Sequence, residues 1–101
     1  MEITIKEQDG RLVAALKGDL SNAASAQAIK SLEPIYERND CDIVIDCTEL
    51  EYISSSGLRI LLNIFKHTRT HDHTTILRGM NDEIADIFDV SGFLQLFTIE
   101  K

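Results

Sequence analysis

Cysteine is scarce in this sequence, and its two cysteines are not spaced as a metal or disulfide site. Cys41 and Cys47 flank an apolar segment and form no Cys-x-x-Cys motif. Isolated cysteines of this kind are most often small, reduced residues of a cytosolic protein. We therefore expect neither a disulfide framework nor a structural zinc site.

Basic residues and long apolar runs are also lacking. Ten lysines and arginines stand against 17 acidic residues, which gives a formal net charge of −7. A general affinity for nucleic acid or for an anionic membrane needs a positive surface, so a protein partner is the better prediction. No apolar run approaches the length of a membrane span, and the opening MEITIKEQDG lacks the apolar core of a signal peptide. These absences predict a cytoplasmic protein.

The length of 101 residues predicts a single domain over residues 1–101. A chain of this size can bury one packed core without disulfides or a structural metal. No repeat, low-complexity tract or linker divides it.

The first two strands are expected to form a hairpin. Residues 2–6 alternate between polar and apolar side chains, Asp9-Gly10 is a strong signal for a tight turn, and residues 12–16 provide a second apolar strand.

A helix is expected next, over residues 22–38, with Ser21 or Asn22 as its cap. Pro34 should kink this helix or mark a late break, because a proline inside a helix costs about 3 kcal/mol. The apolar residues at helical spacing are Ala23, Ala26, Ile29, Leu32 and Ile35.

The central stretch, residues 43–66, predicts a strand, a serine-rich turn and a helix. Ile43-Val44-Ile45 suits a short strand buried on both faces. Ser54-Ser55-Ser56-Gly57 then leads into a helix whose apolar spacing begins at Leu58 and continues to about residue 70. Serines at such a turn favour helix capping, and the opposite face of the helix is a polar stripe. The members of that stripe are Ser56, Arg59, Asn63, Lys66 and Thr70.

The remaining chain predicts a strand at residues 74–78, a helix capped by Asn81 and closed by Gly92, and a last strand at residues 94–99. The expected order is therefore ββαβαβαβ, an α/β fold in which helices pack on a mixed β-sheet.

Three blocks of this sequence resemble the STAS-domain family, the domain of bacterial anti-sigma-factor antagonists. Residues 52–58, YISSSGL, are similar to its signature turn, in which an apolar residue and an aspartate precede two hydroxyl residues, a glycine and a leucine. Residues 18–21, GDLS, and 84–93, IADIFDVSGF, resemble two further blocks in the family's order. Ser54 and Ser21 stand where the family usually has aspartates.

The resemblance implies a STAS-like fold whose final C-terminal helix is absent or shortened. It also implies an anti-sigma-factor antagonist that binds an anti-sigma factor with serine kinase activity and releases its sigma factor. Phosphorylation would switch this binding off, at the hydroxyl just before the glycine, Ser56, with Ser55 as the second choice. A serine phosphatase is a further implied partner. The expected partner-binding residues are Ser21, Asn22, Ser54, Ser55, Arg59 and Asn63.

Elementary electrostatics supports a phosphate at this turn. Free amides and the positive end of the helix dipole would face it, and Arg59 lies one turn further along the same stripe. Modification would add a charge of about −1.5 to −2.

The alternatives are other binding modules. A STAS subunit docked permanently on a transporter ATPase or another large assembly would use Ser56 only as a helix cap. Binding of a nucleotide or small ligand at the turn is a third hypothesis. The oligomeric state is open, with a monomer favoured.

Catalysis and metal binding are not expected. The three serines have no placed His-Asp partner, and no glycine-rich phosphate loop is present. His67 and His71 are four residues apart and could share a helix face, but they lie near a helix end, where imidazolium is favourable against the dipole. We expect no enzyme activity, metal or cofactor.

Overall fold

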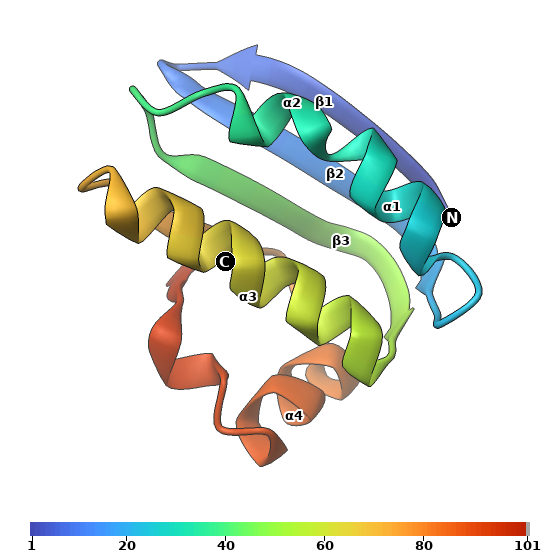
Figure 1. Ribbon diagram of the computed structural model, residues 1–101. Helices are drawn as coiled ribbons and strands as arrows, with labels where there is room; N and C mark the ends of the chain where they lie inside the picture. The colour runs from blue at the N-terminus through green and yellow to red at the C-terminus, as the bar shows by residue number, and fades with distance from the viewer. Residues whose placement is uncertain (101) are drawn as a thin grey trace.

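The computed structural model describes residues 1–100 and contains the predicted order ββαβαβαβ (Figure 1). A short 3-10 helix, η1, precedes the last strand. The elements are β1 Glu2–Gln8, β2 Arg11–Leu20, α1 Ser25–Ser31, α2 Glu33–Tyr36, β3 Ile43–Ile53, α3 Ser55–Thr70, β4 Thr75–Arg78, α4 Asp82–Val90, η1 Leu94–Leu96 and β5 Thr98–Glu100.

The five strands form one mixed sheet in the order β1-β2-β3-β4-β5. β1 runs antiparallel to β2, and the other neighbours are parallel because a helix-containing crossover joins each pair. Asp9 and Gly10 both have positive φ angles, 54° and 77°, as the tight hairpin turn requires. The predicted hairpin is confirmed.

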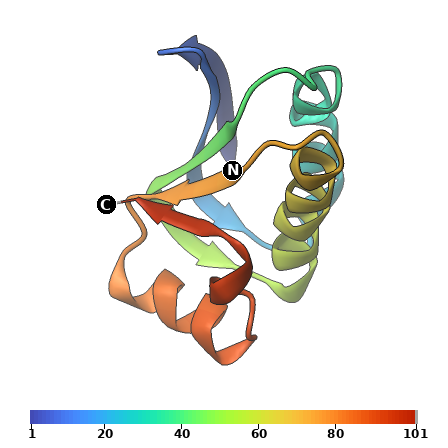
Figure 2. The same cartoon turned by 90° about the vertical axis from the view of Figure 1, so that its left-hand side faces the viewer.

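Helices α1, α2 and α3 lie together on one face of the sheet (Figure 2). The main core fills the space between them and the strands, and α4 adds Ile84 and Phe88 to it. Completely buried side chains at its centre include Leu16, Ile45, Leu61 and Ile64. At the start of α3, Gly57 lies against Leu20 and Ile53 at the ends of β2 and β3.

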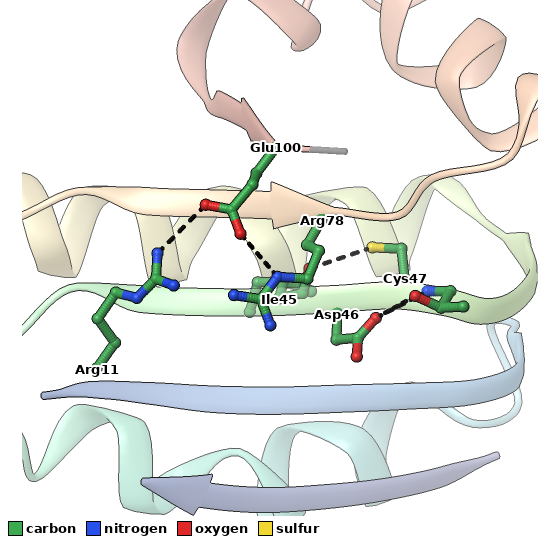
Figure 3. Close-up of polar contacts among 7 residues, drawn as sticks. Arg11, Ile45, Asp46, Cys47, Arg78 and Glu100 are labelled. Carbon is green, nitrogen blue, oxygen red and sulfur yellow. Dashed lines mark hydrogen bonds and ion pairs between the residues drawn. The ribbon is translucent and has the colours of Figure 1, made fainter. Parts of the chain in front are cut away.

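The second face of the sheet carries a smaller cluster of Val13, Val44 and Ile76, without any helix residue. On this face Glu100 accepts hydrogen bonds from Arg78 Nε at 2.9 Å and from Arg11 at 3.3 Å (Figure 3). The two guanidinium groups, Arg78 first, hold the pKa of the Glu100 carboxyl below its usual value. The pair of arginines thereby connects the last strand to β2 and β4.

The helix predicted for residues 22–38 is shorter than expected and divided. α1 begins at Ser25, and α2 begins at Glu33, one residue before Pro34. Pro34 therefore lies in the first turn of α2, where a backbone N–H would have no partner within the helix, so its absence costs nothing. The predicted buried face was also partly wrong. Ala23, Ala26 and Ile29 are exposed, and the buried positions are Ala28, Leu32 and Ile35.

Two strand lengths also differ from the prediction. β3 continues through the polar residues after Ile45 as far as Ile53, because β2 pairs with it over this longer span. Residues 94–96 form η1, so the last strand begins only at Thr98. β5 is the last element that the structure describes within residues 1–100. The absence or shortening of the family's final C-terminal helix stays a prediction.

Both predicted boundary residues of α4 are confirmed. The side chain of Asn81 accepts the Ile84 amide at 2.8 Å, and Gly92 has a φ of 78°. The Phe93 amide donates back to the Phe88 carbonyl at 3.0 Å, which is the Schellman arrangement of a helix end.

Candidate functional site

The candidate site is the first turn of α3, where Ser54 is the N-cap. Ser54 has an extended backbone, and its hydroxyl oxygen accepts the Gly57 amide at 3.1 Å. The side chain of Ser54 is buried. Of the three consecutive serines, Ser54 is therefore the one that caps α3, and it does so from a buried position.

The next two serines are helical residues rather than caps. α3 begins at Ser55, three residues before the predicted apolar pattern starts at Leu58, so Ser55 and Ser56 are its first and second residues. The side chain of Ser55 is exposed and that of Ser56 is half-buried. The amides of the first helical residues lack partners inside the helix, so both hydroxyls lie at its positive end.

Gly57 allows this turn to lie directly on the core. A Cβ atom placed on Gly57 would come within 2.8 Å of both Leu20 Cγ and Ile53 Cγ1. Gly57 is therefore required by close packing. The sequence motif showed that a glycine stands here, but not which neighbours exclude a side chain.

The structure brings the Ser21-Asn22 loop next to the serine turn. Leu20, the last residue of β2, pairs with Ile53, and the Ser54 amide donates to the Leu20 carbonyl at 2.9 Å. Ser21 is half-buried, and its hydroxyl accepts the Ala24 amide at 3.3 Å within the turn before α1. The N-cap of α1 is Ala24, which makes no side-chain capping bond, so the prediction of Ser21 or Asn22 as the cap was wrong. Two sequence segments more than thirty residues apart thus share one end of the sheet.

The polar stripe of α3 continues away from this turn. Arg59, Asn63, Lys66 and Thr70 are exposed, as predicted, whereas Ser56 is only half-exposed. The first turn of α3 contains no acidic residue, and Arg59 forms no ion pair within residues 1–100. The surface beside the serines is therefore open to an anionic group.

Tyr52 is an exposed aromatic residue near the candidate site that the sequence reasoning did not single out. Its side chain is 49% exposed, although it belongs to β3 only two residues before the cap. Large aromatic side chains exposed beside a functional surface are typical anchors of protein partners. Its position just ahead of the serines was visible in the sequence, but alternation along the strand did not reveal its exposure.

The histidines at the far end of α3 are engaged with the backbone. His67 Nε2 donates to the Arg38 carbonyl at 2.7 Å, and His71 Nδ1 donates to the His67 carbonyl at 2.9 Å. These contacts use one ring nitrogen of each histidine, and within residues 1–100 no group of three His, Cys, Asp or Glu side chains is gathered as a metal site.

Both cysteines are buried free thiols. Burial raises the pKa of Cys47 to about 12, with a further contribution from Asp46. The Cys47 thiol is 3.7 Å from the Ile45 carbonyl oxygen, to which it donates (Figure 3). This thiol stays protonated and unreactive at neutral pH.

Comparison with known proteins decides the family. The STAS domain matches residues 2–101. The chain belongs to the STAS-domain family. A relative from Bordetella bronchiseptica named "Putative anti-sigma factor antagonist BtrV" is 31% identical over 99 residues, which cover 98% of this STAS domain and 85% of the relative.

Solved structures show the same fold. An anti-sigma-factor antagonist (STAS) domain protein from Planctomyces limnophilus has a TM-score of 0.87 at 12% identity and covers 98% of this STAS domain and 89% of its own chain. The Bacillus cell fate determinant SpoIIAA in its phosphorylated form has a TM-score of 0.73 at 18% identity, with coverages of 99% and 92%. Within residues 1–100 of this STAS domain, no helix combines the length and apolar character needed to cross a membrane.

Proposed function

We propose that this STAS domain is an anti-sigma-factor antagonist whose binding is controlled by phosphorylation at the first turn of α3. The unmodified protein binds an anti-sigma factor with serine kinase activity and so releases the sigma factor. The phosphorylated protein lets the anti-sigma factor go, and a serine phosphatase reverses the change. This is a binding function without catalysis.

One observation carries the proposal. Ser55 and Ser56 present their hydroxyls at the positive end of α3, while Ser54 alone supplies the cap. A phosphate can therefore be added there without removing the hydrogen bond that starts the helix. The names of the relatives, among them an anti-sigma-B factor antagonist of Listeria monocytogenes, support the choice of partner.

The partner-binding surface extends from this turn along the exposed stripe of α3 and onto the loop after β2. Ser54 is buried and contributes by holding the turn in place. The residues proposed to meet the partner are Ser21, Asn22, Ser55, Arg59 and Asn63, with Ser54 as their support. Tyr52, two residues before the cap in the chain, adds an exposed aromatic side chain to the proposed surface.

A phosphate acts here through charge. It adds about −1.5 to −2 charges that an anti-sigma factor must desolvate or repel when it docks. A cost of about 3 kcal/mol weakens binding more than a hundredfold, which is enough for a switch. No refolding of α3 is required.

The resemblance to the family assigns the phosphate to Ser56, while exposure favours Ser55. Intact-mass spectrometry after incubation with ATP and the candidate anti-sigma kinase distinguishes them. We expect one phosphate on the wild type, none on the Ser55→Ala/Ser56→Ala double variant, and loss in only one of the single variants. Ser91→Ala, an exposed serine at the end of α4, is the matched control and should still be phosphorylated at the serine turn.

The function itself is tested by titrating the anti-sigma factor with unmodified and phosphorylated protein. We expect tight binding only without phosphate. If the wild type acquires no phosphate from a kinase that is active on its own known substrate, the switch is refuted. Equal binding with and without phosphate also refutes it and favours a permanently docked subunit of a larger assembly.

A further inference from the structure

We propose that two copies of this chain associate through the outer edges of their β1 strands, antiparallel and centred on Thr4. This surface is separate from the partner-binding surface proposed for α3. Its failure would leave the phosphorylation switch untouched.

β1 is an open edge of the sheet. It is the terminal strand in the sheet order, and no strand within residues 1–100 pairs with its outer side. Figure 1 shows it along the outer border of the molecule, with β2 on its inner side. β1 has seven residues, whereas the opposite edge strand, β5, has three.

β1 lacks three of the usual protections of an edge strand. Natural edges are blunted by proline, by bulges, by extreme shortness or by charged side chains, and of these β1 has only charges, at Glu2, Lys6 and Glu7. β1 contains no proline, and its register with β2 is uninterrupted from Glu2 to Gln8. It is therefore a regular template for another strand.

The phase of the hydrogen bonds identifies which residues face outward. Gln8 and Arg11 flank a two-residue turn, so they are a hydrogen-bonded pair, and such pairs alternate along the ladder. The Leu12 amide accordingly bonds away from β1, to the Asp42 carbonyl at 3.1 Å, and its partner Glu7 must face outward. The backbone N–H and C=O groups of Ile3 and Ile5 point outward like those of Glu7, because hydrogen-bonding direction alternates along the strand.

Only one nearby antiparallel register makes opposite charges meet. Centring the pair on Thr4 sets Ile3 opposite Ile5 of the second copy, both in the outward hydrogen-bonding phase. The same register sets Glu2 opposite Lys6 twice, once on each side of the two-fold axis. Glu2 and Lys6 are exposed, and neither forms an ion pair within residues 1–100.

The two neighbouring registers toward the end of β1 pair its side chains less favourably. Moving the centre to Ile5 sets Ile3 opposite Glu7, and moving it to Lys6 sets the two lysines opposite each other. Opposite charges between strands stabilise a pair and like charges destabilise it, so charge selects the register. Ile3 and Ile5 are half-buried and pack on the main core, so each would bury more apolar surface beside the other.

Sedimentation velocity over a hundredfold range of concentration, up to about 1 mM, measures the association. We expect a monomer–dimer equilibrium, because an edge pairing of this length is a small interface. Lys6→Glu and Glu2→Lys each create two like-charge pairs and should weaken the dimer about tenfold. The double variant Glu2→Lys/Lys6→Glu restores both pairs and should recover the wild-type equilibrium.

A disulfide tests the register directly. At the proposed centre the two Thr4 Cα atoms are about 4.5 Å apart, within the range that a disulfide spans. Thr4→Cys should therefore form a covalent dimer under mild oxidation. Lys6→Cys is the matched control, because its two copies would be about 13 Å apart and should not cross-link.

A wild type that stays monomeric at the highest concentration overturns the proposal. So does a dimer that both single charge reversals leave unchanged, since it must then use another surface. Cross-linking of Lys6→Cys as efficient as that of Thr4→Cys contradicts the register. A thermal melt of each variant checks that it is folded under the conditions in which association is measured.

Discussion

The backbone N–H of Ser54 donates a 2.9 Å hydrogen bond to the carbonyl oxygen of Leu20. This bond joins the ends of two parallel strands, β2 and β3, at the point where each chain segment leaves the sheet. The loop at Ser21-Asn22 and the first turn of α3 consequently form one continuous surface. The first two predictions concern Ser54 and Gly57, the residues that hold the first turn of α3 at this point.

Ser54→Ala should lower the free energy of unfolding by about 1 to 2 kcal/mol. The substitution removes the acceptor of the Gly57 amide at a buried helix start. Urea unfolding measures the change. The matched control is Ser55→Ala, whose side chain is exposed and which should stay within about 0.5 kcal/mol of the wild type. Equal losses in the two variants would show that Ser54 has no special capping role.

Gly57→Ala should destabilise the protein by about 1 to 3 kcal/mol, even though alanine is the better helix former. The added methyl group would meet the side chains of Leu20 and Ile53 at 2.8 Å. Asn63→Ala, on the exposed face of the same helix, has no such neighbour and should be neutral or slightly stabilising. Urea unfolding of both variants decides the question, and a gain in stability for Gly57→Ala would contradict the packing account.

Tyr52→Ala should weaken binding to the anti-sigma factor tenfold or more, on the order of 1.4 kcal/mol. Tyr52 lies two residues before the Ser54 cap and its side chain is 49% exposed, so the variant should bind less well and still fold normally. Val90→Ala serves as the control, because Val90 is 89% exposed on α4, outside that surface. Isothermal titration calorimetry measures both. An unchanged affinity for Tyr52→Ala would remove this residue from the surface.

The ion pair at the last strand should make stability depend on acid pH. The pKa of Glu100 is lowered in the folded protein by Arg78 and then Arg11, so its contribution is complete above the ordinary carboxyl pKa of 4.5. That contribution is lost as the pH falls through the lower pKa of the folded state. Thermal melts from neutral to acid pH should therefore show the wild type above Glu100→Gln at neutral pH, and the two should converge in acid.

Arg78→Gln provides an independent control for that result. It removes the guanidinium that approaches Glu100 most closely, at 2.9 Å, and should reproduce most of the loss seen in Glu100→Gln at neutral pH. A constant difference between wild type and Glu100→Gln at every pH would mean that the variant changes packing rather than charge.

Local chemistry in the sequence determined the parts of this protein that depend on neighbouring residues. Asp9-Gly10 specified the hairpin turn, Asn81 and Gly92 marked the two ends of α4, and the serine run marked the start of α3. Each of these features is made by hydrogen bonds or φ angles within a few residues, so a short window of sequence contains its cause.

The tertiary structure decided what depends on residues far apart in the chain. The buried face of α1 and α2 uses Ala28 in place of Ala26 and Ile29, because the contacts of α3 and the sheet select the side that is covered. Pairing with β2 extended β3 to Ile53. The burial of Ser54 likewise depends on the approach of Leu20, whose carbonyl accepts the Ser54 amide and which no local pattern contains. The sequence by itself therefore determined where the serine turn lies, and only the folded chain decided which serine supports it and which can meet a partner.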